Sequence, residues 1–119
     1  ELSVQDLVAE AKQHITEVNA ATARQLLEEG NIVVVDVREE SEYANGHIDN
    51  AVPLPRGVLE FKVGGIPELA DKSKTVLAYC RTGGRSALAA QTLQQLGYNN
   101  VLSMAGGFEA WQQAFNQKS

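Results

Sequence analysis

The sequence predicts a single α/β domain built around a parallel sheet. Segments rich in β-branched residues alternate along the chain with segments that have helical apolar spacing. The run Ile32–Asp36 contains four consecutive β-branched apolar residues without polar alternation, which is typical of a strand covered on both faces. A length of 119 residues suits one hydrophobic core and is too short for two.

The chain opens with an expected amphipathic helix over residues 2–14. Ser3 is a suitable N-cap, and Asp6 follows three residues later in a variant of the capping box. We therefore expect two parts, an N-terminal helical extension over residues 1–15 and the domain proper over residues 16–119.

The remaining elements alternate as a parallel α/β fold requires. Further helices are expected over residues 20–29, 39–44, 86–96 and 108–115, with single helical turns over 57–62 and 67–71. Strands or extended segments are expected over residues 32–36, 51–55, 75–79 and 100–103. Ligands of such sheets bind beyond the carboxyl ends of the strands. Asp36 and Cys80, each at a strand end, are therefore expected to share one rim.

Cys80 is the only cysteine of the chain, and it stands where an apolar strand gives way to a helix. Two glycines and two arginines follow it in the run Cys-Arg-Thr-Gly-Gly-Arg-Ser over residues 80–86. Backbone N–H groups of a glycine-rich turn and the positive end of a helix would converge on the sulfur and stabilise a thiolate. This pattern predicts a nucleophile. The alternative is a buried structural cysteine, which would need neither the glycines nor the arginines.

Bulk properties exclude several other functions. A net charge of −5 argues against nucleic acid and anionic membranes as partners, and no apolar run approaches the length of a membrane span. A lone cysteine cannot form an internal disulfide, and the two histidines, His14 and His47, have no metal-ligand spacing. A reducing, cytoplasmic location is the expectation, and no bound metal is expected.

Five segments in the same order resemble the rhodanese family of single-domain sulfurtransferases. The resemblance extends over about residues 16–116 and rests on Val-Asp-Val-Arg at 35–38, Glu-Tyr-Ala-Asn-Gly-His-Ile at 42–48, Ala-Val-Pro-Leu at 51–54, the cysteine loop at 80–86, and Gly-Gly-Phe-Glu-Ala-Trp at 106–111. It implies a five-stranded parallel sheet flanked by helices on both faces, with the residues 2–14 helix as an addition.

The resemblance also implies a mechanism without a cofactor. Cys80 would take the outer sulfur of a small anionic donor such as thiosulfate, become a persulfide, and pass the sulfur to cyanide, a thiol or a protein acceptor. The substrate-binding loop would consist of Arg81, Thr82, Gly83, Gly84, Arg85 and Ser86. The guanidinium groups of Arg81 and Arg85 suit an oxyanion, although either side chain could instead turn outward into solvent. Ser86 is expected to cap the following helix and to donate within the loop.

Four residues outside the loop are expected to support the site. Asp36, Arg38 and Glu42 form a scaffold cluster of salt-bridging side chains, and His47 makes a structural hydrogen bond in its Gly-His-Ile turn.

Three other functions compete with sulfur transfer. Cysteine-dependent phosphatases close a similar loop with arginine, but their loop is one residue longer than the spacing between Cys80 and Arg85. An arsenate reductase would need a resolving cysteine, and this chain has none. A non-catalytic binding or regulatory module of the same fold usually lacks the cysteine.

Overall fold

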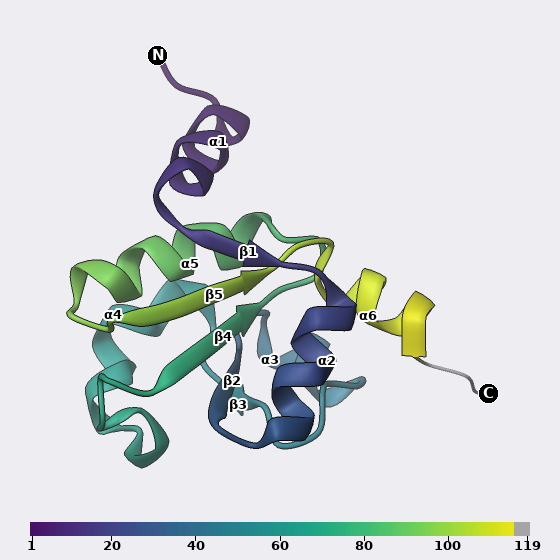
Figure 1. Ribbon diagram of the computed structural model, residues 1–119. Coiled ribbons are helices and arrows are strands. Elements are labelled where there is room, and N and C mark those ends of the chain that lie inside the picture. The colour runs from purple at the N-terminus through teal and green to yellow at the C-terminus, as the bar shows by residue number, and fades with distance from the viewer. Residues whose placement is uncertain (116–119) are drawn as a thin grey trace.

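Five parallel strands form one twisted sheet at the centre of the molecule (Figure 1). The computed structural model describes residues 1–115, and the strands lie side by side in the order β1-β5-β4-β2-β3. Their bounds are β1 Thr16–Val18, β2 Ile32–Asp36, β3 Val52–Pro53, β4 Thr75–Tyr79 and β5 Asn100–Met104. β4 pairs with β2 and with β5, so the strand that leads to Cys80 is central.

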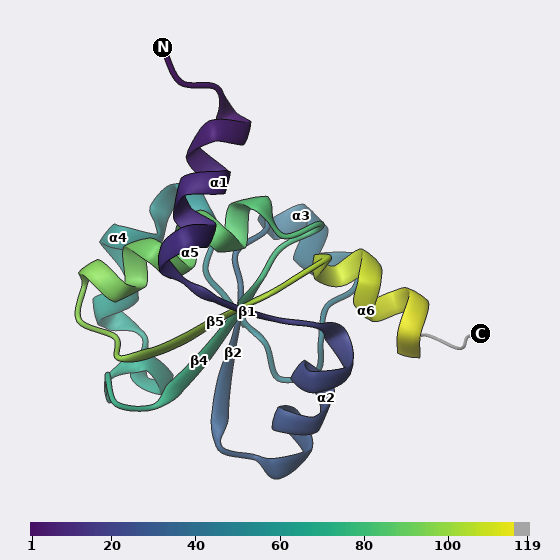
Figure 2. The ribbon, with the colours of Figure 1, turned by 45° about the horizontal axis from the view of Figure 1, so that its top comes forward.

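Helices cover both faces of the sheet. Their bounds are α1 Val4–His14, α2 Ala20–Glu29, α3 Glu40–Ala44, α4 Leu59–Lys62, α5 Gly84–Gln95 and α6 Gly107–Phe115, with 3-10 turns at Arg56–Val58, Val63–Gly65 and Pro67–Leu69. α4 and α5 pack on one face, and α2 and α6 pack against each other on the opposite face (Figure 2).

Strand β4 shows why its sequence lacks polar alternation. Val76 and Ala78 point into the core beneath α4 and α5, whereas Leu77 and Tyr79 point into the core beneath α2 and α6. All four side chains are buried. A strand covered on both sides must be apolar on both sides, as the sequence predicts.

Most expected elements are confirmed, and the differences have local causes. Ser3 caps α1, and the capping box with Asp6 is complete. β1 was not predicted from its composition, because Thr-Glu-Val is short and polar and becomes a strand only by pairing with β5. The extended segment 51–55 contributes only a two-residue strand, since its prolines cannot donate ladder hydrogen bonds.

The expected start of α5 was wrong by two residues. The helix begins at Gly84, and its N-cap is Gly83, not Ser86. Ser86 therefore lies inside the first turn of α5, where its backbone N–H and its hydroxyl both face the cysteine loop.

Helix α1 stands as a ridge beside α5 and extends beyond the body of the domain (Figures 1 and 2). Ala11 is its one buried residue, whereas Leu2, Val4 and Leu7 at its outer end are exposed. Val8 lies over the start of α5, close to Gly84. Within residues 1–115, no helix is long and apolar enough to cross a membrane.

Candidate functional site

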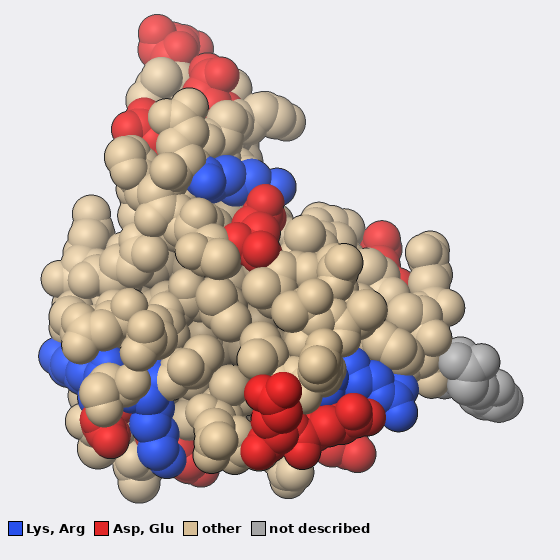
Figure 3. Space-filling model, in the orientation of Figure 1, with Lys and Arg blue, Asp and Glu red and all other residues tan. Residues whose placement is uncertain are grey.

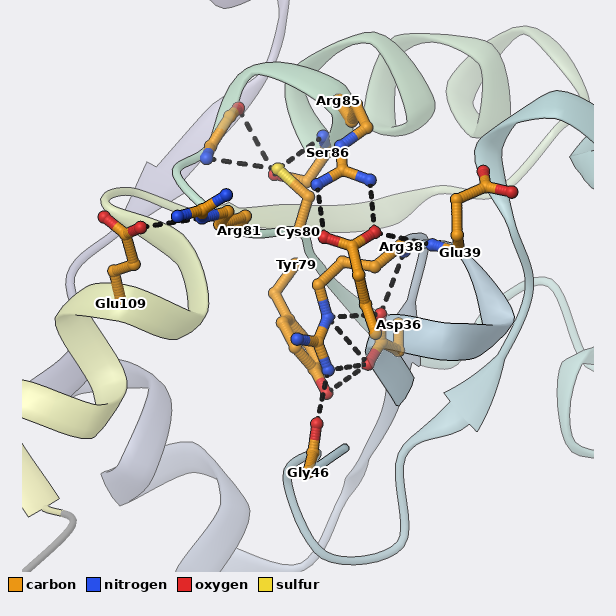
Figure 4. A network of polar contacts seen from close by, with 12 residues as sticks. Asp36, Arg38, Glu39, Gly46, Tyr79, Cys80, Arg81, Arg85, Ser86 and Glu109 are labelled. Carbon is orange, nitrogen blue, oxygen red and sulfur yellow. Dashed lines mark hydrogen bonds and ion pairs between the residues drawn. The ribbon is translucent and has the colours of Figure 1, made fainter. Parts of the chain in front are cut away.

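Cys80 lies at the carboxyl end of β4, at the bottom of the loop that leads into α5 (Figure 4). The residue is 1% exposed. Two backbone N–H groups donate to its sulfur, that of Gly83 at 3.1 Å and that of Ser86 at 3.3 Å. These donors stabilise negative charge on the sulfur. The expected convergence of loop amides and helix N-terminus on one thiol is therefore present.

The loop depends on a backbone conformation that glycine adopts most readily. Gly83 has φ of +114°, and a Cβ atom there would lie 3.4 Å from the backbone N of Gly106. The turn at Gly83 brings the N–H groups of Gly83 and Ser86 to the same side as the sulfur. Thr82 is exposed in the loop, and Gly84 begins the helix.

The hydroxyl groups of Ser86 and Ser103 form a buried, hydrogen-bonded pair on the Cys80 side of α5 and β5. Ser86 Oγ is 3.6 Å from Cys80 Sγ and 2.8 Å from Ser103 Oγ on β5. Both serines are fully buried. Sequence reasoning missed Ser103, although a polar residue inside an otherwise apolar strand was a usable signal.

Asp36, Arg38 and Tyr79 form a buried polar cluster next to the loop. The Asp36 carboxylate accepts hydrogen bonds from the Arg38 guanidinium, at 2.8 Å from Nη2, and from the Tyr79 hydroxyl at 2.6 Å. Burial opposes the charge of Arg38, yet its hydrogen bonds with Asp36 raise its pKa above the ordinary value. Burial, together with the hydrogen bond to Asp36, raises the pKa of Tyr79. Arg38 also donates to the carbonyl of Gly46 at 2.6 Å, so the cluster ties β2 to the following turn.

Glu42 and Arg85 form a two-pronged ion pair that joins α3 to α5. The carboxylate accepts from Nη1 at 2.8 Å and from Nη2 at 3.0 Å. The hydrogen bonds from Arg85 lower the pKa of Glu42 to about 2, and burial opposes this only in part. The pKa of Arg85 is raised in return, first by its hydrogen bonds to Glu42. The second arginine of the loop is therefore anchored to the scaffold.

Arg81 pairs with a residue that the sequence did not single out. Its Nε donates to Glu109 Oε2 at 2.8 Å and so joins the loop to the first turn of α6 (Figure 4). Both side chains are largely exposed, at 67% for Arg81 and 49% for Glu109. Neither arginine of the loop is thus an unpaired cation. Nothing in the local sequence identified Glu109, since its partner is 28 positions away.

The N-terminus of α6 is fastened to the backbone of the cysteine loop. Phe108 N donates to the carbonyl of Cys80 at 2.8 Å, and Glu109 N donates to that of Arg81 at 3.1 Å. Gly107 has φ of +59°, and a Cβ atom there would lie 2.5 Å from the backbone of Arg81. Only glycine allows this close approach of helix and loop.

His47 lies in the turn after α3 and does not contact the loop directly. Its Nδ1 is 2.8 Å from the carbonyl of Tyr43, and the two rings are stacked with centroids 3.7 Å apart. These contacts agree with the structural role that the sequence suggested.

A hollow of about 330 Å³ opens beside the cysteine loop. It is lined by Arg38, Glu42, Asn45, Gly46, Arg81, Phe108, Glu109 and Gln112. A larger hollow of about 410 Å³ lies between α2, α6 and the turn at residues 47–50, and no residue of the cysteine loop lines it. Of the cysteine loop, Arg81 lines the smaller hollow. In the described part of the chain, no cluster of three or more His, Cys, Asp or Glu side chains could hold a metal ion.

Known proteins with similar sequences and structures carry related names. A thiosulfate sulfurtransferase, GlpE, of Coxiella burnetii is 38% identical over 95 residues, covering 80% of this chain and 85% of that protein. A sulfurtransferase of Allochromatium vinosum is 35% identical over 98 residues, covering 82% and 88%.

Solved structures agree on the fold. A protein of unknown function from Rhodopseudomonas palustris, described as a possible tyrosine phosphatase, superposes with a TM-score of 0.85 at 32% identity and covers 95% of this chain and 91% of its own. A human single-domain sulfurtransferase, TSTD1, superposes with a TM-score of 0.75 at 26% identity, covering 87% and 97%. The family model of the rhodanese-like domain matches residues 19–114, and the chain therefore belongs to the rhodanese-like family.

Proposed function

We propose that this protein is a sulfurtransferase that carries sulfane sulfur as a persulfide on Cys80. The observation that carries the proposal is the pair of backbone N–H groups, from Gly83 and Ser86, that donate to the cysteine sulfur. Donors that stabilise a thiolate also stabilise a terminal persulfide anion, which occupies the same loop with the same charge. The relatives named sulfurtransferase support this assignment.

The reaction has two steps. The Cys80 thiolate attacks the outer sulfur of thiosulfate, a new S–S bond forms, and sulfite leaves with the electron pair of the broken S–S bond. The persulfide anion on Cys80 is then attacked at its outer sulfur by an acceptor. With cyanide, thiocyanate forms and the Cys80 thiolate is regenerated, so charge and atoms balance in both steps. The given sequence contains no second cysteine, and the proposed acceptor is a separate thiol or protein.

The other loop residues bind the anionic donor and the transferred sulfur or hold the loop in position. In this proposal the N–H groups of residues 81–86 surround the transferred sulfur, and Arg81 meets the sulfonate end of the donor at the mouth of the hollow. Arg85 acts by position, because its ion pair with Glu42 holds the start of α5. Asp36 and Arg38 act by position, because they hold β2 to the turn at Gly46, and His47 holds the turn after α3.

Phosphoryl transfer is the competing activity, in line with the description of the Rhodopseudomonas palustris neighbour. A phosphatase loop needs a free arginine to bind the transferred phosphoryl group. In this chain Arg85 is already paired with Glu42, and the loop is short. Both features favour sulfur transfer.

The decisive experiment is an assay of thiocyanate formation from thiosulfate and cyanide, with intact-mass measurement after exposure to thiosulfate. We expect turnover and a gain of one sulfur atom on the wild-type chain, and neither on Cys80→Ser. Turnover that survives in Cys80→Ser would contradict the assignment. Hydrolysis of an aryl phosphate by the wild type, lost in Cys80→Ser, together with no sulfur gain, would favour the phosphatase. No reaction with any substrate would favour a binding module.

The proposal extends to the organisation of the chain and its surroundings. Residues 1–15 are assigned to a helical extension and residues 16–119 to the catalytic domain, of which residues 116–119 lie outside the described part of the chain. A persulfide intermediate is stable to unwanted oxidation in a reducing compartment, which suits the cytoplasm. The partners are a small anionic sulfur donor and a thiol or protein acceptor.

A further inference from the structure

Three arginines line or adjoin the mouth of the site, and each faces a carboxylate. Arg38 is paired with Asp36 in the buried cluster, and Arg85 with Glu42 through two hydrogen bonds. Arg81 and Glu109 form the third pair, through one hydrogen bond between exposed side chains. Exposed pairs of this kind contribute little and exchange readily, so Arg81 is the arginine that can change partner most easily.

The backbone of Glu109 is held next to the hollow of about 330 Å³ beside the cysteine loop. It belongs to the first turn of α6, and its own backbone N–H donates to the carbonyl of Arg81. The close contact at Gly107 fixes that turn against the loop. Both Arg81 and Glu109 line the hollow of about 330 Å³. An anion that enters this hollow therefore meets the guanidinium group and its carboxylate together.

We propose that Glu109 is a specificity-determining residue that competes with the donor for Arg81. The proposal rests on the sulfurtransferase function above and deepens it. Thiosulfate carries two negative charges, and it must displace Glu109 from Arg81 and then bind beside the displaced carboxylate. A donor with a single negative charge meets half the repulsion. Glu109 thus selects against doubly charged donors and favours singly charged ones.

The test compares two donors that share the same reactive S–S bond. Thiosulfate is a dianion, whereas an aryl thiosulfonate carries one charge fewer. In Glu109→Gln we expect kcat/KM for thiosulfate to rise about two- to fivefold, the range that an exposed ion pair supports. The rise should come from KM, with kcat little changed. The change for the thiosulfonate should be smaller, and the difference should shrink as salt screens the charges.

Glu60→Gln is the matched control. It removes a carboxylate from another partly exposed Arg–Glu pair, with Arg56, and changes the net charge by the same amount. Glu60 lies on α4 and does not line the hollow. We expect both donors to react with this variant as with the wild type. Equal gains in Glu109→Gln and Glu60→Gln would reduce the effect to net charge and overturn the proposal.

A second readout does not depend on turnover. Sulfate, an unreactive dianion, should protect Cys80 from alkylation by iodoacetamide at lower concentration in Glu109→Gln than in the wild type, at constant ionic strength. If neither donor gives turnover but sulfate protection differs as expected, the sulfurtransferase proposal fails and the competition for Arg81 stands. If turnover is normal but Glu109→Gln leaves both the donor preference and sulfate protection unchanged, only the competition is wrong.

Discussion

At the level of single residues, three polar groups lie next to the sulfur of Cys80. They are the backbone N–H groups of Gly83 and Ser86 and the hydroxyl of Ser86, which is itself hydrogen-bonded to the hydroxyl of Ser103. When Ser103 donates to Ser86, the Ser86 hydroxyl is free to donate to a thiolate. When Cys80 is a thiol, it can itself donate to Ser86 Oγ at 3.6 Å. The pair thus serves both protonation states by rotation of hydroxyl groups.

Ser103→Ala tests this positioning role. Loss of the Ser103 hydroxyl leaves Ser86 without its 2.8 Å partner, which should favour its alternative bond to the carbonyl of Gly83. We expect persulfide formation on Cys80 at fixed pH to slow and stability to fall by about 1 kcal/mol. Ser103→Thr retains the hydroxyl and should restore the rate. A rate in Ser103→Ala that matches the wild type would leave Ser103 with a packing role only.

The ion pair of Glu42 and Arg85 gives a pH dependence with a definite sign. The folded-state pKa of Glu42 is about 2, below the ordinary value of 4.5. Its ionised form therefore stabilises the fold fully above pH 4.5, and this contribution is lost as pH falls from 4.5 toward 2.

Glu42→Gln provides the comparison, because glutamine can still accept the hydrogen bond from the N–H of Glu39. Measured by urea unfolding, the stability difference between wild type and Glu42→Gln should be largest near neutral pH and should shrink below pH 4.5. Glu28→Gln, which removes the exposed pair with Arg24, should differ little from the wild type. A difference for Glu42→Gln that is constant with pH would contradict the pairing.

At the level of elements, the site is the junction of β4, α5 and α6. The first turn of α6 donates hydrogen bonds to the carbonyls of Cys80 and Arg81. Two consecutive glycines, Gly106 and Gly107, make this contact geometrically possible. The Gly-Gly-Phe segment thus acts on the loop from the far end of the sequence.

Gly107→Ala should separate α6 from the loop. The new Cβ would meet backbone atoms of Arg81 and Cys80 at 2.5 and 2.6 Å, which cannot be relieved by a side-chain rotation. We expect a loss of about 3 kcal/mol in stability, part from positive φ and part from overpacking, together with slower persulfide formation.

Gly30→Ala is the matched control for the backbone cost. Gly30 ends α2 with φ of +86°, and a Cβ atom at this position would have no neighbour within 4 Å. This variant should lose only about 1 kcal/mol and retain full activity. Equal losses in the two variants would show that the contact between α6 and the loop is unimportant.

At the level of the whole molecule, the N-terminal helix α1 projects from the body of the domain (Figure 1). On the face in Figure 3 the charged side chains gather toward the edges and along α1, and the area over the central strands is largely free of them. The family model begins at residue 19, beyond α1. The Rhodopseudomonas palustris neighbour covers 95% of this chain, so its likeness takes in at least part of that helix.

Removal of residues 1–15 tests the proposed boundary. The shortened chain keeps β1, which begins at Thr16, and loses the cover that Val8 and Ala11 give to α5. We expect a folded protein with one cooperative urea transition, a stability lower by roughly 1–3 kcal/mol, and persulfide loading within a few-fold of the full chain. A chain that no longer unfolds cooperatively would show that α1 belongs to the domain itself.

The order of elements, the buried central strands and the reactive loop could all be predicted from local sequence. Val-Val-Val before Asp36, the capping box at Ser3, and glycines between Cys80 and Ser86 act through nearest neighbours, by steric preference and by local hydrogen bonding. The effects of these local interactions can be predicted from the order of residues alone. They determined the fold class, the place of Cys80 at the end of a strand and the nature of its loop.

The partners of the charged and polar groups were decided only by the tertiary structure. Arg81 meets Glu109 and Ser86 meets Ser103 because the sheet brings β4, α5, β5 and α6 together. β1 likewise exists as a strand only beside β5. Side-chain pairing depends on distances across the fold, and those distances follow from the packing of the whole chain around its sheet.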